Sequence, residues 1–492
     1  MDTITTDRRR WLALAIVCMA QLMIVLDTTI VNVALPSIQH DLHFTQGNLT
    51  WVVNAFLVTF GSFLLLAGRL GDLIGRRSVF LAGVFVFTLA SALCGIAPSG
   101  GVLIVARFVQ GVGAAMQASV ILAIIVTEFP QPSERARAMS AYVFTAVAGG
   151  SLGLLLGGVL TQALSWHWIF FVNLPIGAAT FALGQRLIPR DSGLGLGHGV
   201  DWLGSVLVTA SLGIAVYAIV SATSHGWGSV QVLGFGSVAV ALMAAFLTLE
   251  SRIENPIMPL RILRLRGLIG ASAVRGFLVT GMYSTFFLGT LYMEHVLHYG
   301  ALQTGAAFLP WTLTVAVLSM GVASRLVARF GPLRVMVFGM LMVMAGLTTF
   351  HATGLHTTFF PTIFAASFLI GLGIGSAFMP LLTIAMSDVP PADAGLGSGI
   401  TNVSQQVAGA LGLALLSTIA TNHTKGLLAA HHPLGSSLIA GYHVAFLVGV
   451  GAVAIGLLVA LAVLRDPKPA TIEPAAEVQS IERDWTEERV AA

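Results

Sequence analysis

The chain contains 492 residues, of which 56% are hydrophobic and 9% are Asp, Glu, Lys or Arg. Soluble proteins average about 25% charged residues, so this composition excludes a soluble globular protein, and apolar runs of about 18 residues or more predict membrane-spanning helices. The formal net charge is +3, but the basic residues are scattered over the connections, which argues against a nucleic-acid partner. Cys18 and Cys94 lie inside apolar runs, so neither a disulfide framework nor a CxxC metal site is expected.

Breaks at charged residues, prolines and glycines predict fourteen transmembrane helices and therefore an all-α integral membrane protein. The expected ranges are 11–36, 49–67, 78–97, 101–127, 139–161, 167–188, 201–221, 229–250, 268–293, 303–327, 333–351, 359–387, 398–421 and 441–464. The first apolar run follows Arg8-Arg9-Arg10 and continues to about Pro36 without a small-residue cleavage site. It is therefore predicted to be an uncleaved first helix rather than a signal peptide.

Alternate connections between these helices differ in positive charge. If the N-terminus is cytoplasmic, the inner connections and the tail hold nearly all Arg and Lys residues outside the helices, whereas the outer connections hold only Lys425. Because basic residues favour the cytoplasmic side, this pattern predicts an even number of spans. Both termini are then cytoplasmic, and the protein is expected in a cell membrane, in particular a bacterial inner membrane.

An internal repeat divides the chain. AGRLGDLIGRRSVFLAG, which ends at Gly83, aligns with ASRLVARFGPLRVMVFG, which ends at Gly339, and a second match pairs Gly113 with Gly373. Two parallel six-helix repeats are typical of transporters that handle substrate near the membrane midplane. The expected segments are a cytoplasmic N-terminus (1–10), a first six-helix bundle (11–190), a linker with two extra transmembrane helices (191–266), a second six-helix bundle (267–464) and a disordered cytoplasmic tail (465–492).

Residues 68–77, GRLGDLIGRR, form the predicted inner loop between the second and third helices. This loop resembles the signature of the major facilitator superfamily, in which it latches the cytoplasmic side of the outward-facing state. The resemblance implies that Asp72 faces the start of the helix at 398–421, around Gly397 to Gly399, and that Arg76 pairs with Glu128. The whole implied latch consists of Gly68, Asp72, Gly75, Arg76, Arg77 and Glu128. Cytoplasmic anchoring is the alternative, and it explains the arginines but neither Asp72 nor the glycines.

Four further segments resemble the fourteen-helix drug/proton antiporters of the EmrB/QacA type. They are LDTTIVNVALPSI (26–38), RFVQGVGAAM (107–116), GGSLGLLLGG (149–158) and SWHWIFFVNLPIG (165–177). The third segment resembles the antiporter motif of the fifth helix, which implies a close-packing surface formed by Gly149, Gly153, Gly157 and Gly158. Leu154 stands where the family has proline, which leaves the local bend of this helix in doubt.

Asp27 and Arg107 are the candidates for proton coupling. Charged side chains inside a membrane are costly and almost always face the protein interior or a cavity, so Asp27 is predicted to be a proton-coupling or cation-sensing carboxylate. The rival hypothesis is a structural Asp that is hydrogen-bonded to Thr28, Thr29 or Asn54. Arg107 needs a partner inside the bundle, and the family resemblance assigns it to proton transfer, with a fixed structural ion pair as the rival.

Polar and aromatic residues in the predicted helices are candidates for substrate binding. They are Asn32, Asn54, Gln110, Gln117, Tyr142, Tyr283, Asn402, Gln405 and Gln406. Arg275 is expected instead to extend to the membrane interface. Apolar walls with few polar groups suit amphipathic, drug-sized compounds, and the sparse acidic residues favour neutral or monocationic ones.

These features together predict a proton-coupled multidrug efflux transporter that exports hydrophobic or amphipathic small molecules by alternating access. A dedicated exporter of one metabolite or self-made antibiotic is the alternative. A Walker A sequence is missing, so direct use of ATP is not expected. A membrane receptor and a membrane-embedded enzyme are weaker alternatives, because Asp27 and Arg107 are both present and the helices hold no catalytic or metal-binding cluster. The expected partners are drug-like molecules, protons and the lipid bilayer, with no cofactor and no metal, and the protein is expected to be a monomer.

Overall fold

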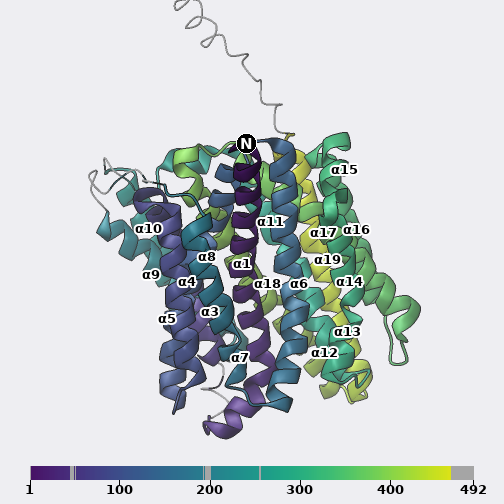
Figure 1. Cartoon of the computed structure of the whole chain (residues 1–492). Coiled ribbons are helices and arrows are strands. Elements are labelled where there is room, and N and C mark those ends of the chain that lie inside the picture. The colour runs from purple at the N-terminus through teal and green to yellow at the C-terminus, as the bar shows by residue number, and fades with distance from the viewer. Residues whose placement is uncertain are drawn as a thin grey trace, which may run out of the picture.

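The computed structural model describes residues 2–44, 49, 51–191, 193, 195, 201–253, 256 and 258–466. Throughout these residues the regular structure is helical, and the long helices run side by side through the molecule (Figure 1). A helix pairs its backbone N–H and C=O groups within its own segment, which suits these apolar sequences to a bilayer. The predicted all-α class is therefore confirmed. The predicted tail, apart from residues 465–466, lies outside the described residues.

Twelve helices in the described part are long and apolar enough to cross a membrane. Nine of them are α1 (Asp2–Asp41), α3 (Trp51–Ile74), α4 (Arg76–Gly95), α5 (Gly100–Glu128), α9 (Trp202–His225), α10 (Val230–Glu250), α16 (Pro332–His351), α18 (Ala394–Ala429) and α19 (Leu434–Val463). The other three are composite rods: α7 (Trp168–Phe171) with α8 (Asn173–Leu187); α13 (Ala301–Ala307), α14 (Leu309–Val317), η4 (Leu318–Val322) and α15 (Ala323–Phe330); and η5 (Phe359–Ile363) with α17 (Phe364–Ser387).

The predicted number of fourteen spans is not confirmed by these twelve helices. Two further rods lie at predicted positions: α6 (Pro132–Ala163), and α11 (Arg266–Tyr283), which continues through η3 (Ser284–Leu288) and α12 (Gly289–His295). α6 packs against α1, and α11 packs against α18 and α19, so both belong to the bundle.

Several helices are longer than their apolar cores predict. α1 already begins at Asp2 instead of residue 11, α6 begins at Pro132 instead of 139, and α18 extends from Ala394 to Ala429 instead of 398–421. Hydropathy reports only the part of a helix that needs an apolar environment, whereas the helical hydrogen bonds continue into polar turns.

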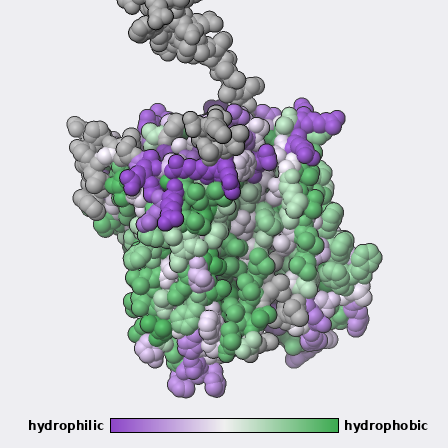
Figure 2. Space-filling model, viewed as in Figure 1, coloured by the Kyte–Doolittle hydropathy of each residue, from purple (hydrophilic) through white to green (hydrophobic). Residues whose placement is uncertain are grey.

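The surface of the bundle carries a broad apolar belt between two polar ends (Figure 2). We call the end at which α3 passes into α4 the basic end, because Arg69, Arg76 and Arg77 lie there. Lys425, near the end of α18, marks the opposite end. This belt is the surface expected of a multi-pass membrane protein.

The internal repeat is visible in the packing of equivalent glycines. A Cβ on Gly83 of α4 would lie 2.8 Å from the carbonyl oxygen of Gly113 in α5, and a Cβ on Gly339 of α16 would lie 2.6 Å from that of Gly373 in α17. Only glycine allows two helix backbones to approach so closely. The α4–α5 pair of the first half therefore has its counterpart in the α16–α17 pair of the second half.

The turns that begin these helix pairs are also repeated. Gly75 and Gly331 both have positive φ, +98° and +83°, a conformation that favours glycine. Asp191 accepts hydrogen bonds from the backbone N–H of Arg76 (2.7 Å) and Arg77 (3.3 Å), and Asp466 accepts one from the N–H of Leu333 (2.9 Å). Each half thus uses an aspartate from beyond its last helix to satisfy free N–H groups at a helix start.

Candidate functional site

Asp27 of α1 and Arg107 of α5 form a fully buried ion pair. The Arg107 Nη1 atom lies 2.5 Å from Asp27 Oδ2, and at most 1% of either side chain is exposed to solvent. Arg107 also donates from Nε to the carbonyl oxygen of Val52 in α3, at 2.9 Å. Its guanidinium lies over the ring of Phe56, 4.6 Å from the centroid. The pair therefore joins three helices in a setting that excludes water.

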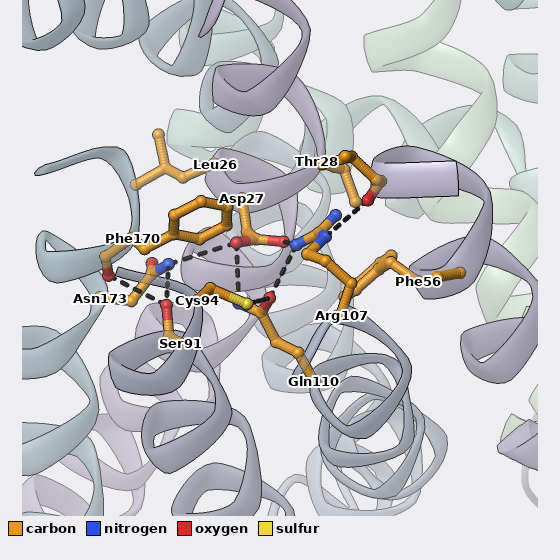
Figure 3. A network of polar contacts seen from close by, with 12 residues as sticks. Leu26, Asp27, Thr28, Phe56, Ser91, Cys94, Arg107, Gln110, Phe170 and Asn173 are labelled. Atoms are coloured by element: carbon orange, nitrogen blue, oxygen red, sulfur yellow. Dashed lines mark hydrogen bonds and ion pairs between the residues drawn. The ribbon is translucent and has the colours of Figure 1, made fainter. Parts of the chain in front are cut away.

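A network of amides and hydroxyls surrounds this ion pair (Figure 3). Gln110 accepts from Arg107 Nη1 at 2.7 Å and donates to Asp27 Oδ1 at 2.8 Å. Asn173, the first residue of α8, donates to Asp27 Oδ1 at 3.4 Å and to the Ser91 hydroxyl of α4 at 3.1 Å. Asp27 thus accepts from three side chains, and the network reaches five helices: α1, α3, α4, α5 and α8.

The described hydrogen bonds of Asp27 come from Arg107, Gln110 and Asn173, whereas the structural hypothesis named Thr28, Thr29 or Asn54. Thr28 and Thr29 donate to carbonyl oxygens of their own helix, as helical Ser and Thr hydroxyls often do. Asn54 is half-buried in α3 and lies outside the hydrogen-bond network described for Asp27. The sequence missed Ser91 and Asn173 as members of the network, although Asn173 is a conspicuous polar residue in an apolar segment.

A central cavity of about 210 Å³ lies between the two sets of helices. From α1, residues 21, 24, 25 and 28 line it at helical spacing, so one face of that helix borders the cavity. Aromatic residues contribute much of the wall: Phe60, Tyr142, Tyr283, Phe286, Phe308, Trp311 and Phe378. Mostly apolar walls with few polar groups are typical of sites for small organic molecules.

The predicted substrate residues fall into two groups. Tyr142, Tyr283, Asn402, Gln405 and Gln406 line the cavity. Three other candidates do not line it: Gln110 belongs to the Asp27 network, Gln117 is fully buried in α5, and Asn54 lies elsewhere on α3. The prediction for Asn32 falls on a side chain outside the described residues. The position of a residue along a predicted helix does not show which face of the helix borders the cavity, so the sequence could not separate the two groups.

The expectation that Arg275 extends to the membrane interface is wrong. Its side chain lines the central cavity, and the residue is only 3% exposed. The guanidinium donates to Gln405 Oε1 and, at 3.4 Å, to the carbonyl oxygen of Thr401. Gln405 and Thr401 belong to α18, so packing of α11 against α18 holds Arg275 inside the bundle.

The 68–77 segment connects the two halves at the basic end. The Asp72 carboxylate accepts hydrogen bonds from the backbone N–H groups of Gly395 and Leu396, both at 2.8 Å. These are the second and third residues of α18, so the contact begins two residues before the predicted Gly397 to Gly399. A Cβ on Gly68 would lie 2.5 Å from the Gly395 carbonyl oxygen, which explains the need for glycine there. The negative charge of Asp72 is stabilised at this position, because the N-terminus of a helix such as α18 carries a partial positive charge.

The partner predicted for Arg76 needs correction. Arg76 contacts Asp72 at 3.3 Å and donates to the Thr127 hydroxyl at 2.6 Å. Glu128 lies instead beside Arg9 and Arg10, and its carbonyl oxygen accepts from Arg10 at 3.4 Å. Successive residues of a helix point about 100° apart, so Thr127 faces α4 while Glu128 faces α1. Arg77 donates to the carbonyl oxygen of Gln185 in α8.

Glycines of the fifth predicted helix pack closely on α1. A Cβ on Gly149, Gly153 or Gly157 of α6 would lie within 3.1 Å of Val25, Thr29 or Ile30, respectively. Gly158 has open space around it, and the side chain of Leu154 lies outside the described residues. The spacing of the first three glycines thus creates the expected close-packing surface, which holds α1 and its Asp27 in place.

The helices form a multi-pass bundle, and an amphipathic cavity lies between its two repeated sets. This architecture is typical of membrane transporters. The chain belongs to the Major Facilitator Superfamily, which its sequence matches over residues 17–413. It is similar to the solved human organic anion transporter MFSD10 (TETRAN), with a TM-score of 0.65 and 16% identity, over 92% of this chain and 99% of that one. This likeness shows a shared fold.

Curated relatives include proteins of antibiotic resistance and export. The chain is 39% identical over 462 residues to the puromycin resistance protein pur8 of Streptomyces alboniger, covering 93% of this chain and 91% of the relative. It is 35% identical over 426 residues to the cephamycin export protein CmcT of Amycolatopsis lactamdurans, covering 85% and 87%. Its relatives are therefore bacterial drug and antibiotic transporters, whereas the fourteen-helix EmrB/QacA type stays a prediction.

Proposed function

We propose that this protein is a proton-coupled exporter that moves hydrophobic or amphipathic small molecules out of the cell by alternating access. The observation that carries the coupling is the buried Asp27–Arg107 pair. A proton on Asp27 would remove the negative charge and leave Arg107 without its counterion in a water-free environment. Leaving one member of a buried pair uncompensated costs about 3–5 kcal/mol. Protonation would therefore favour a different packing of the helices that the network joins.

The coupling and the cavity meet on α1. Asp27 belongs to the buried network, and its neighbour Thr28 lines the cavity. A rotation or shift of α1 on protonation would therefore change the cavity wall directly. Gly149, Gly153 and Gly157 of α6 pack closely on α1, so such a movement would also change the contact between α1 and α6. This arrangement supports an exchange in which proton binding and substrate binding favour different conformations.

We place the basic end in the cytoplasm and count fourteen spans, with α6 and the α11–α12 rod added to the twelve. Helix α6 has 32 residues, which span about 48 Å at 1.5 Å per residue. Asp72 and its contacts with α18 then close the cytoplasmic side, as the latch of this family does. The first and second bundles would cover residues 11–190 and 267–464, with α9 and α10 in the linker.

Dedicated export of one compound is the second candidate. It is favoured by two relatives that are named for a single compound, a puromycin resistance protein and a cephamycin export protein. The two candidates differ in the breadth of compounds that drive transport, because a dedicated exporter would move one member of a panel far better than the rest.

Transport into everted membrane vesicles tests both candidates. We expect uptake of amphipathic drugs that collapses with a proton ionophore, and a loss of about tenfold or more in Asp27→Asn. Asp41→Asn is the matched control, because Asp41 lies on the same helix but binds Trp166 Nε1 at 2.8 Å, away from the network. Uptake that resists the ionophore, or full transport by Asp27→Asn, would contradict proton coupling.

A further inference from the structure

Arg275 brings a permanent positive charge to the central cavity. It is the single charged residue among the described residues that line this cavity. A guanidinium keeps its proton under all physiological conditions, so the charge cannot be removed by titration. The cavity is therefore not electrically neutral, although its walls are mostly apolar.

The charge of Arg275 has no acidic counterpart in the described part of the chain. No Asp or Glu oxygen there lies within 4.0 Å of its guanidinium, in contrast to Arg107 with Asp27. Its neighbours are neutral: Gln405, the Thr401 carbonyl, the Tyr142 phenol and the ring of Phe378, 5.7 Å from the guanidinium carbon. Furthermore, the Nε atom is buried and has no hydrogen-bond partner.

A buried cation without a counterion is costly unless its charge is compensated. The Asp27 carboxylate cannot compensate it, because Asp27 is already engaged by Arg107, Gln110 and Asn173. A molecule inside the cavity can supply the missing negative charge. Carboxylate oxygens match the planar donors of a guanidinium, and such hydrogen bonds are among the strongest in proteins.

We propose that the central cavity selects amphipathic organic anions, whose carboxylate or similar acidic group binds Arg275 while the apolar part packs on the aromatic walls. Phe286, Phe308 and Trp311 form one such wall, and their ring centroids lie 5.2 to 6.3 Å apart. Gln406 and Asn402 also line the cavity and add amide groups to its wall. This specificity differs from the neutral or monocationic compounds that the sparse acidic residues favoured. It refines the proposed export function by naming the substrate class of the same cavity.

A matched pair of fluorescent probes tests the charge preference. N-Dansyl-phenylalanine carries a carboxylate, and its methyl ester has nearly the same shape without the charge. Binding of both would be measured on the whole protein in lipid nanodiscs at pH 7, with empty nanodiscs to subtract partition into lipid. Hydrogen bonds to charged groups are strong enough for about a tenfold or larger effect, so we expect the acid to bind at least about tenfold more tightly than the ester.

Variants of the protein test whether the Arg275 side chain causes the preference for the acid over the ester. We expect Arg275→Gln to bind the two probes with nearly equal affinity, and Arg275→Lys to keep part of the preference for the acid. Phe286→Ala should weaken both probes to a similar degree, because it shortens the aromatic wall without changing the charge. Size-exclusion chromatography before and after the titrations identifies variants that have not folded.

Equal binding of acid and ester to the unchanged protein would overturn the proposal, and so would an acid preference that persists in Arg275→Gln. The result is independent of transport. If the acid preference is found but vesicles show no proton-driven export, the export function fails and the anion site stands. If proton-driven export is found without an acid preference, only the anion site fails.

Discussion

The charged residues within the helices are the costliest to bury, because a charge in an apolar environment needs compensating partners. Asp27 is tolerated because Arg107, Gln110 and Asn173 all donate to its carboxylate. Arg107 in turn gains a backbone carbonyl and the face of Phe56. Burial of an ion pair is acceptable only when the remaining donors and acceptors are also satisfied. Before any proton binds, the Asp27 carboxylate therefore already accepts from three side chains and has little capacity for further hydrogen bonds.

A double-mutant cycle measures how strongly these two residues depend on each other. Asp27→Asn and Arg107→Gln should each destabilise the protein by about 3–5 kcal/mol, since each leaves an uncompensated buried charge. The double variant removes both charges and should lose clearly less than the sum of the single losses. Reversible unfolding in detergent would give the three values. Additive losses would show that the pair does not interact as the geometry indicates.

At the scale of helices, glycine contacts bring the two halves together at the basic end. Gly68 of α3 meets Gly395 of α18, and a Cβ on Gly399 would lie 3.0 Å from the carbonyl oxygen of Leu64. The close approach lets the short Asp72 side chain reach the first N–H groups of α18. Nearby, Asp393 pairs with Arg261 at 2.8 Å and with Arg69 at 3.9 Å. The glycines provide proximity, and the carboxylates provide directional bonds.

Removal of the Asp72 carboxylate should loosen this contact. In a protein with Cys18 and Cys94 replaced by serine, cysteines at Arg69 and Asp393 would be joined by a short bismaleimide. We expect Asp72→Ala to lower the cross-linked fraction severalfold and to slow transport about tenfold, because two charge-assisted hydrogen bonds are lost.

Glu134→Ala is the control for the Asp72 experiment. Glu134 is also acidic and lies at the basic end, but it pairs with Arg10 at 3.3 Å, a contact between α1 and α6 within the first half. Cross-linking by this variant should match the parent. Undiminished cross-linking and transport in Asp72→Ala would show that the segment only anchors the protein.

Across the whole molecule, the two halves share a packing plan but differ in chemistry. Ala328 takes the place of Asp72 in the repeat, and Ser367 takes the place of Arg107 because Phe108 aligns with Phe368. The Ser367 hydroxyl donates to the Ala307 carbonyl, an ordinary contact between helices. The second half instead contributes Arg275 and the Phe286, Phe308 and Trp311 wall. The first half thus holds the candidate proton site, and the second half holds much of the proposed substrate site.

Cysteine labelling from one side of the membrane tests the proposed topology. In the same cysteine-free background, single cysteines at Ser133 and Ala163 bracket α6, and those at Arg264 and His298 bracket the α11–α12 rod; all four positions are exposed. A membrane-impermeant maleimide should label Ala163→Cys and His298→Cys from outside intact cells. Ser133→Cys and Arg264→Cys should react only in everted vesicles. Labelling of both ends of one rod from the same side would remove that rod from the fourteen spans.

Much of the fold could be predicted from the sequence, because helices in a bilayer are governed by local hydropathy and by glycine spacing. Apolar runs predicted the positions of the helices, and the aligned glycines predicted the internal repeat. Helix ends were less predictable, since α1, α6 and α18 continue into polar turns. The motif resemblance also predicted a contact between Asp72 and the start of α18. In the structure this contact is with Gly395 and Leu396 instead of Gly397.

The sequence by itself determined that this protein is a membrane bundle of two repeats, and it singled out Asp27 and Arg107. Only the tertiary structure decided which polar groups meet. A helix has several faces, and the neighbours on each face come from remote parts of the chain. Packing therefore decides that Gln110 and Asn173 are partners of Asp27 and that Glu128 lies beside Arg10 instead of Arg76. It also places Arg275 in the central cavity, where the sequence predicted the membrane interface.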